Sequence, residues 1–209
     1  MTSIRFLGNA CTEIIGEQDH IIIDPVFLLT PTKGIDSIFL THHHPDHMNV
    51  DIISEIQEKD VKNGAEIPIF GPDSIQEEFS IDLTLIEPGS VVNINNGFVE
   101  IFENDCWKAP GCVAYLIVID NKRILHTADS ASFSQNLKEI KDSIDVCFIA
   151  CFERNFNDYL SFLQTLSPKV TIPYHFNYEK EEEGKKLTEF LNDNGINSKF
   201  LSIGLEYKL

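Results

Sequence analysis

Short runs of β-branched and other apolar residues recur along the chain, separated by turns rich in glycine, proline, asparagine and aspartate. This pattern is typical of β-strands, because branched side chains pack well on a pleated surface. It predicts strands at residues 4–7, 20–23, 37–40, 67–70, 91–94, 98–102, 113–119, 123–126, 146–149, 170–172 and 200–203.

Apolar residues return at helical spacing in four other stretches, which predicts helices at residues 50–59, 133–141, 159–166 and 180–194. In the first of these, Ile52, Ile53 and Ile56 share one face. Strands joined by tight turns dominate the first half, whereas the last third alternates helix with strand. The order of elements predicts an α/β protein in which a mixed sheet, or two sheets, is covered by helices.

The length and net charge of the chain limit its expected domain organisation and partners. The 209 residues predict a single domain over 1–209, because no repeat or flexible linker divides them. Sixteen basic against 33 acidic residues give a net charge of −17, so we expect no nucleic-acid and no membrane partner. A small-molecule substrate is the expected partner. No apolar leader or membrane span is visible, which predicts a cytoplasmic protein.

Five cysteines stand at irregular spacing without a C-x-x-C pair. An odd number without a regular framework predicts reduced thiols, as expected in a cytoplasm. Most of them are expected to act as small buried hydrophobic residues.

The segment Thr41-His42-His43-His44-Pro45-Asp46-His47 follows a predicted strand and holds four of the seven histidines. Imidazole and carboxylate groups are the ligands that Zn²⁺ and related divalent ions accept. On a loop, His42 and His44 point to one side, while Asp46 and His47 turn past Pro45 towards a neighbouring position. The spacing predicts that one loop supplies two adjacent metal positions.

The chain resembles the metallo-β-lactamase superfamily, whose signature is a strand followed by T-H-x-H-x-D-H. Four blocks carry the resemblance in order: residues 4–10 with 21–25, residues 41–47, the H-T-A-D-S segment 126–130, and the I-P-Y-H-F segment 172–176. The opening strands look like those of the small branch that includes ascorbate-6-phosphate lactonase. The resemblance implies a mixed α/β fold, a four-layer αββα sandwich of two mixed β-sheets with helices on the outer faces.

Carried over to this chain, the resemblance implies one metal ion held by His42 and His44. A second ion would be held by Asp46, His47 and His175, with Asp129 bridging the two. The expected cofactor is therefore zinc, as one or two ions, with manganese or iron as further candidates.

Relatives supply a third histidine to the first metal from the stretch between residues 102 and 115, and this chain has none there. Asp105, Cys106, Cys112 or a water molecule could take its place. A thiolate from either cysteine is an accepted zinc ligand.

These features predict a metal-dependent hydrolase that uses a metal-bound hydroxide on a small ester, lactone, phosphodiester or amide. Asp46 is the expected catalytic residue, orienting the nucleophile and handling its proton. The alternative is a non-hydrolytic descendant of the fold that has a degraded first metal site and binds a metal or a ligand. Trp107 is expected to be a packing residue, and Arg154 a surface residue that could instead pair with an anionic group.

Overall fold

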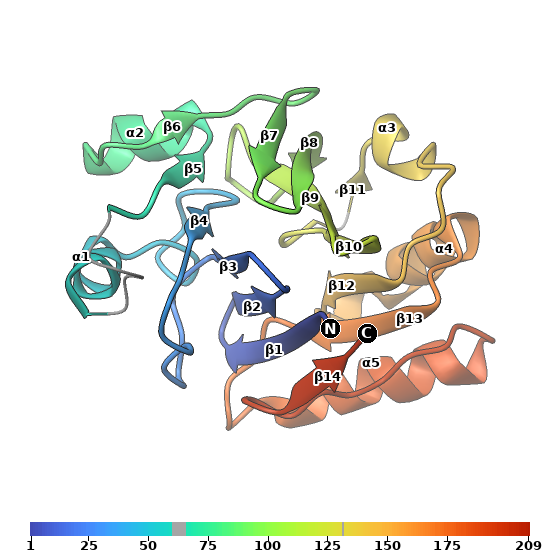
Figure 1. Ribbon diagram of the computed structural model, residues 1–209. Coiled ribbons are helices and arrows are strands. Elements are labelled where there is room, and N and C mark those ends of the chain that lie inside the picture. Colours follow the sequence, from blue (N-terminus) through green and yellow to red (C-terminus); the bar gives the residue numbers. More distant parts are fainter. Residues whose placement is uncertain (60–65, 131) are drawn as a thin grey trace.

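The computed structural model describes residues 1–59, 66–130 and 132–209, and its strands form two β-sheets that face each other (Figure 1). The first sheet has the order β14-β1-β2-β3-β4-β5-β6. Its pairs β3/β4, β4/β5 and β5/β6 are parallel and the others antiparallel. In chain order its strands are β1 (Ser3–Gly8), β2 (Cys11–Ile15), β3 (His20–Ile23), β4 (Ser37–Phe39), β5 (Ile69–Gly71), β6 (Thr84–Leu85) and β14 (Glu206–Lys208).

The second sheet has the order β11-β8-β9-β10-β12-β13, and β7 pairs with β8 beside this path. The pairs β10/β12 and β12/β13 are parallel. All five residues of β12 are buried, as expected for a parallel strand covered on both faces. Its strands are β7 (Val91–Ile94), β8 (Gly97–Asp105), β9 (Val113–Ile119), β10 (Lys122–His126), β11 (Ser132–Phe133), β12 (Val146–Ala150) and β13 (Val170–Tyr174).

Successive apolar side chains in the strands of the first sheet point to opposite faces, which gives the sheet an apolar layer on each face. In β3, Ile21 and Ile23 join the large core between the sheets, whereas Ile22 joins a second core on the outer face. The same division places Phe39 between the sheets and Ile38 outside. This period of two follows from side chains that point to opposite faces of a strand.

Helices cover the outer faces of both sheets. Helices α1 (Val50–Lys59) and α2 (Asp73–Phe79) add their buried residues to the core outside the first sheet. The second sheet is covered by α3 (Gln135–Lys138), α4 (Phe156–Leu166) and α5 (Glu181–Asp193), with a 3-10 turn, η1 (Glu153–Asn155), before α4. None of the helices in the described ranges is long and apolar enough to cross a membrane. The predicted αββα sandwich is confirmed.

Two predicted elements are wrong. The stretch 200–203 is not a strand, because the chain turns through Gly204 at a φ of 85° and forms β14 only afterwards. The predicted helix at 133–141 shrinks to α3, because Phe133 pairs in β11 and the Ser134 side chain caps the helix by accepting from the Leu137 amide.

A buried ion pair fixes the segment that leads to β4. Glu13 is fully buried and contacts the Arg5 Nε at 2.8 Å and the His20 Nε2 at 2.9 Å. Its carboxylate also accepts the Thr32 amide at 2.6 Å. Burial alone would raise the pKa of Glu13, but these partners lower it below its usual value.

We expect Glu13→Gln to lower the free energy of unfolding by about 3 kcal/mol near neutral pH, because it leaves buried partners without their counter-charge. A carboxyl group with a lowered pKa stabilises the fold above its unfolded-state pKa and loses this effect as pH falls through the folded-state pKa. In urea unfolding, the difference from the unsubstituted protein should therefore shrink as the pH falls below the usual titration range of a glutamate. An equal difference at acidic and neutral pH would contradict this role.

Candidate metal centre

The loop after β4 has the local structure needed to bring several ligands together. The amides of His47 and Met48 both donate to the His44 carbonyl, at 2.9 and 3.0 Å, which closes a tight turn. Asn49 then starts α1, because its side-chain oxygen accepts the amides of Asp51 and Ile52. Because β4 pairs in parallel with β3, the turn lies at the carboxyl end of a parallel strand. Open α/β sheets bind their ligands at this end of their strands.

Four of the predicted metal ligands lie close together beside this turn. Ligand atoms of Asp46, His47, Asp129 and His175 all lie within 4.8 Å of one another. Asp129 Oδ2 is 3.1 Å from His47 Nε2 and 3.3 Å from His175 Nε2. Asp46 Oδ2 is 3.2 Å from His175 Nε2. Asp129 follows β10 and His175 follows β13, so both sheets contribute to the cluster.

The atoms that face each other in this cluster suit a cation. The buried atoms His47 Nε2, His175 Nε2 and Asp129 Oδ1 have no hydrogen-bond partner. Such groups are costly to bury unless something else binds them. Two imidazoles and two carboxylates form a donor set that zinc, iron and manganese accept. The residues present therefore fit a divalent metal ion.

Electrostatics also favour a cation between these side chains. Burial opposes the charged forms, but the neighbouring carboxylates hold the pKa of His47 well above its usual value and raise that of His175 to about 9. The same contacts keep the pKa of Asp129 well below its usual value. The close contact with His175 lowers the pKa of Asp46 to about 2. The cluster is thus held together by opposite charges, and a metal ion would replace the two protons on the histidines.

Asp24 contacts the cluster through His47, and the motif at residues 41–47 did not reveal it. It follows β3, is fully buried, and lies 2.7 Å from His47 Nδ1 through its Oδ2. The Thr41 hydroxyl and amide also donate to its carboxylate, at 2.7 and 2.8 Å. A carboxylate on the far nitrogen of a ligating histidine fixes the ring and its tautomer. The Ile-Asp-Pro block at 23–25 was the signal that could have identified it.

We expect Asp24→Asn to weaken metal affinity by about 10- to 100-fold, because it removes the charge that orients His47. Competition with a chelator of known affinity measures this change. The matched control is Asp51→Asn, on the exposed start of α1. Equal affinities in the two variants would show that Asp24 does not support the site.

A second group surrounds His42, which is fully buried. Ligand atoms of His42, Cys106 and Cys112 lie within 4.8 Å of one another, and His42 Nε2 is 3.1 Å from His44 Nδ1. Burial lowers the pKa of His42 to about 3. Asp105, at the end of β8, is exposed and belongs to neither group.

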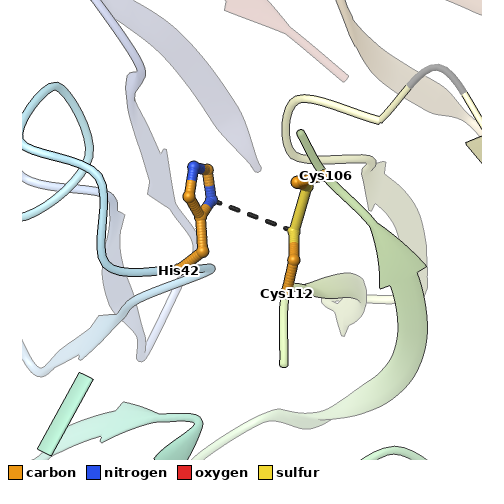
Figure 2. Close-up of side chains that lie close together, drawn as sticks. All are labelled: His42, Cys106 and Cys112. Carbon is orange, nitrogen blue, oxygen red and sulfur yellow. Dashed lines mark hydrogen bonds between the residues drawn. A yellow bond between two sulfur atoms is a disulfide. The ribbon is translucent and has the colours of Figure 1, made fainter. Parts of the chain in front are cut away.

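Cys106 and Cys112 form a disulfide, so the expectation of reduced thiols is wrong for this pair (Figure 2). The hairpin between β8 and β9 brings the two residues together, a proximity that sequence spacing does not disclose. Cys11, Cys147 and Cys151 are free and buried, as expected.

Two residues near the clusters were predicted without a ligand role. Trp107 is 68% exposed, so the expectation that it packs in the interior is wrong. Its ring centroid lies 6.4 Å from that of His44. Arg154 is exposed, as expected, and lies over the Phe152 ring, which in turn contacts His175.

Three of the nine non-glycine residues with a positive φ in the described ranges lie at or beside the cluster. Asp24, Ala128 and His175 have φ values of 51°, 47° and 70°. Non-glycine residues rarely adopt this left-handed region, and such strain persists where surrounding contacts over-determine it. Each of these residues is a member of the cluster or lies beside one.

Comparison with known proteins decides the family. A model described as a beta-lactamase superfamily domain matches residues 3–175. The chain belongs to this superfamily. The resemblance of the motif blocks is therefore confirmed, whereas the lactonase-like branch stays a prediction. A relative, the UPF0173 metal-dependent hydrolase of Thermococcus onnurineus, is 26% identical in an alignment 205 positions long, which covers 85% of each of the two chains.

Several solved structures have the same fold as this chain, although their sequence identity to it is low. The metallo-beta-lactamase fold protein YhfI from Bacillus subtilis covers 100% of both chains, with a TM-score of 0.79 and 14% identity. CmlA, a diiron beta-hydroxylase from Streptomyces venezuelae, has a TM-score of 0.76 at 14% identity. All of this chain matches 54% of the CmlA chain. The same fold thus occurs in proteins of different chemistry.

Proposed function

We propose that the protein, a metal-dependent hydrolase, cleaves a small ester, lactone, phosphodiester or amide at a zinc site formed by Asp46, His47, Asp129 and His175. The observation that carries this proposal is the convergence of four side chains that can bind a metal ion, three of which, His47, Asp129 and His175, have a buried atom without a hydrogen-bond partner. A bound divalent ion lowers the pKa of a coordinated water from 15.7 towards about 7 and polarises a substrate oxygen.

The residues of the cluster divide into holding and reacting roles. His47, Asp129 and His175 are buried or nearly so, and Asp24 and Thr41 hold His47 in place. The Asp46 side chain is 50% exposed, and one of its oxygens faces His175. Its other oxygen is therefore available to accept a proton from water beside the substrate.

The charge and the exposed side chains around the cluster favour a small substrate. A net charge of −17 repels polyanions, while a metal ion makes the local potential positive. Trp107 offers an exposed aromatic surface beside His44. Arg154 offers an exposed cation above Phe152, near His175. A substrate with an apolar part and one anionic or polar group fits these features.

The test is hydrolysis by metal-loaded protein of one aryl ester, one lactone, one aryl phosphodiester and one anilide. We expect turnover of at least one, and a loss of about 100- to 10,000-fold in kcat for Asp46→Asn. The matched control is Asp158→Asn, which changes an exposed carboxylate on α4.

Zinc, manganese and iron are each loaded separately, because a fold neighbour is a diiron enzyme. No turnover by fully loaded protein with any of the three would favour the non-hydrolytic alternative. Equal activity of Asp46→Asn and the control would contradict the role given to Asp46.

A further inference from the structure

The disulfide closes a short loop directly beside His42. Cys106 follows β8 and Cys112 precedes β9, so the loop is the connection of that hairpin. Figure 2 shows the sulfur of Cys112 facing the His42 ring, with the cysteines and the histidine coming from different sheets. The two cysteines are 5% and 1% exposed, whereas Trp107 between them is exposed.

Reduction would change what this group offers to a metal ion. In a disulfide the sulfurs carry no charge, whereas thiolates are strong ligands for zinc and other thiophilic ions. Two thiolates and one imidazole form a Cys₂His set, which holds zinc in other proteins with one coordination position open. The three ligand atoms already lie within 4.8 Å of one another.

The orientation of His42 suits this role. Its Nδ1 is 3.9 Å from the Cys112 sulfur, and its Nε2 is 3.1 Å from His44 Nδ1. The Thr41 hydroxyl lies 3.0 Å from the same Nδ1 but donates to Asp24. Coordination at Nδ1 therefore requires the tautomer with its proton on Nε2, where His44 accepts it. A ligating histidine is typically held through its second nitrogen in this way.

We propose that His42, Cys106 and Cys112 form a redox-controlled site for a thiophilic divalent ion such as zinc, which binds only after the disulfide is reduced. A dithiol reductant supplies two electrons and two protons, the S–S bond breaks, two thiols form, and the dithiol leaves as its own disulfide. On metal binding, the two thiols release two protons to solvent and two sulfur–metal bonds form.

This site is separate from the one in the proposed function and does not depend on it. The ring centroids of His42 and His47 are 3.9 Å apart, so the two groups are neighbours. Cys106 and Cys112 also pack against Ala128, next to Asp129. The redox state of the loop would thus decide whether a second ion lies beside the first.

The test compares the full-length protein in two forms, one oxidised and one reduced with a dithiol that is then removed under nitrogen. Thiol titration after denaturation should find three free cysteines in the oxidised form and five in the reduced form. Each form is loaded with zinc, and separately with Co²⁺. We expect one further metal ion per chain in the reduced form, and a thiolate-to-cobalt charge-transfer band in that form alone.

Variants locate the extra ion. Cys106→Ser with Cys112→Ser should lose the additional ion and the cobalt band while keeping the ion of the Asp46 cluster. Cys147→Ala, a buried free cysteine of β12, should keep both. Equal metal content in the two redox forms of the unsubstituted protein would overturn the proposal. So would a cobalt band that survives in the double variant, or five titratable thiols in protein treated with oxidant. These experiments do not measure hydrolysis, so a result that overturns the redox-controlled site leaves the proposed function unaffected.

Discussion

Asp129→Asn is expected to lower both metal affinity and kcat/KM by more than about 100-fold, since even residues that only orient a ligand account for about 10- to 100-fold in affinity. The Asp129 carboxylate lies between His47 and His175 and is the main opposite charge for both. Asparagine has nearly the same size but no charge, so the variant tests the charge and not the packing. Metal analysis and steady-state kinetics measure the two effects.

The control for this variant is again Asp158→Asn, which changes an exposed carboxylate on α4. Circular dichroism establishes that both variants fold. A folded Asp129→Asn protein that retains full metal content would show that the four-residue cluster is not the binding site.

Removal of metal is expected to destabilise the protein strongly. The cluster joins the loop after β4 of the first sheet to residues following β10 and β13 of the second, so a bound ion links the two sheets. With free metal at 1,000 times its Kd, binding adds about 4 kcal/mol to the free energy of unfolding. In a chain of this size, that lowers Tm on chelation by roughly 8–16 °C.

Thermal unfolding with and without a chelator measures this shift. Asp129→Asn provides the matched comparison, because its weaker metal binding should leave a smaller change in Tm on chelation. An identical Tm with and without chelator in the unsubstituted, metal-loaded protein would contradict the link between the sheets.

Much of the fold was predictable because branched apolar runs have few alternatives to a strand. The runs at 20–23, 113–119 and 146–149 correspond to β3, β9 and β12. Strand β2 escaped prediction because Thr12 and the buried Glu13 interrupt its apolar pattern. Helix α2 is only seven residues long and has no side-chain cap, so it carries little local signal.

In the candidate site, too, the residues that lie close together in the sequence were predictable from the sequence alone. His42, His44, Asp46 and His47 were found from one loop, because metal chemistry requires those residue types close together. Asp129 and His175 were identified through the resemblance, and the structure brings both to Asp46 and His47. Their function as ligands stays a prediction.

Other parts of the site could not be predicted, because they depend on contacts between distant segments. Asp24 acts through a contact with His47, 23 positions further along the chain. The Cys106–Cys112 bridge depends on the hairpin geometry that places both sulfurs beside His42. The sequence left Asp105, both cysteines and water open for the missing ligand, and the structure brings the two cysteines together.

We propose that Asp46, His47, Asp129 and His175 hold a metal ion. The most direct test of this proposal is an anomalous-difference map from crystals of the protein grown with zinc, recorded on both sides of the zinc absorption edge. We expect a peak among these four side chains that is present above the edge and absent below it. Full zinc loading in solution with no peak at this position, or with the peak at other residues, would contradict the proposal.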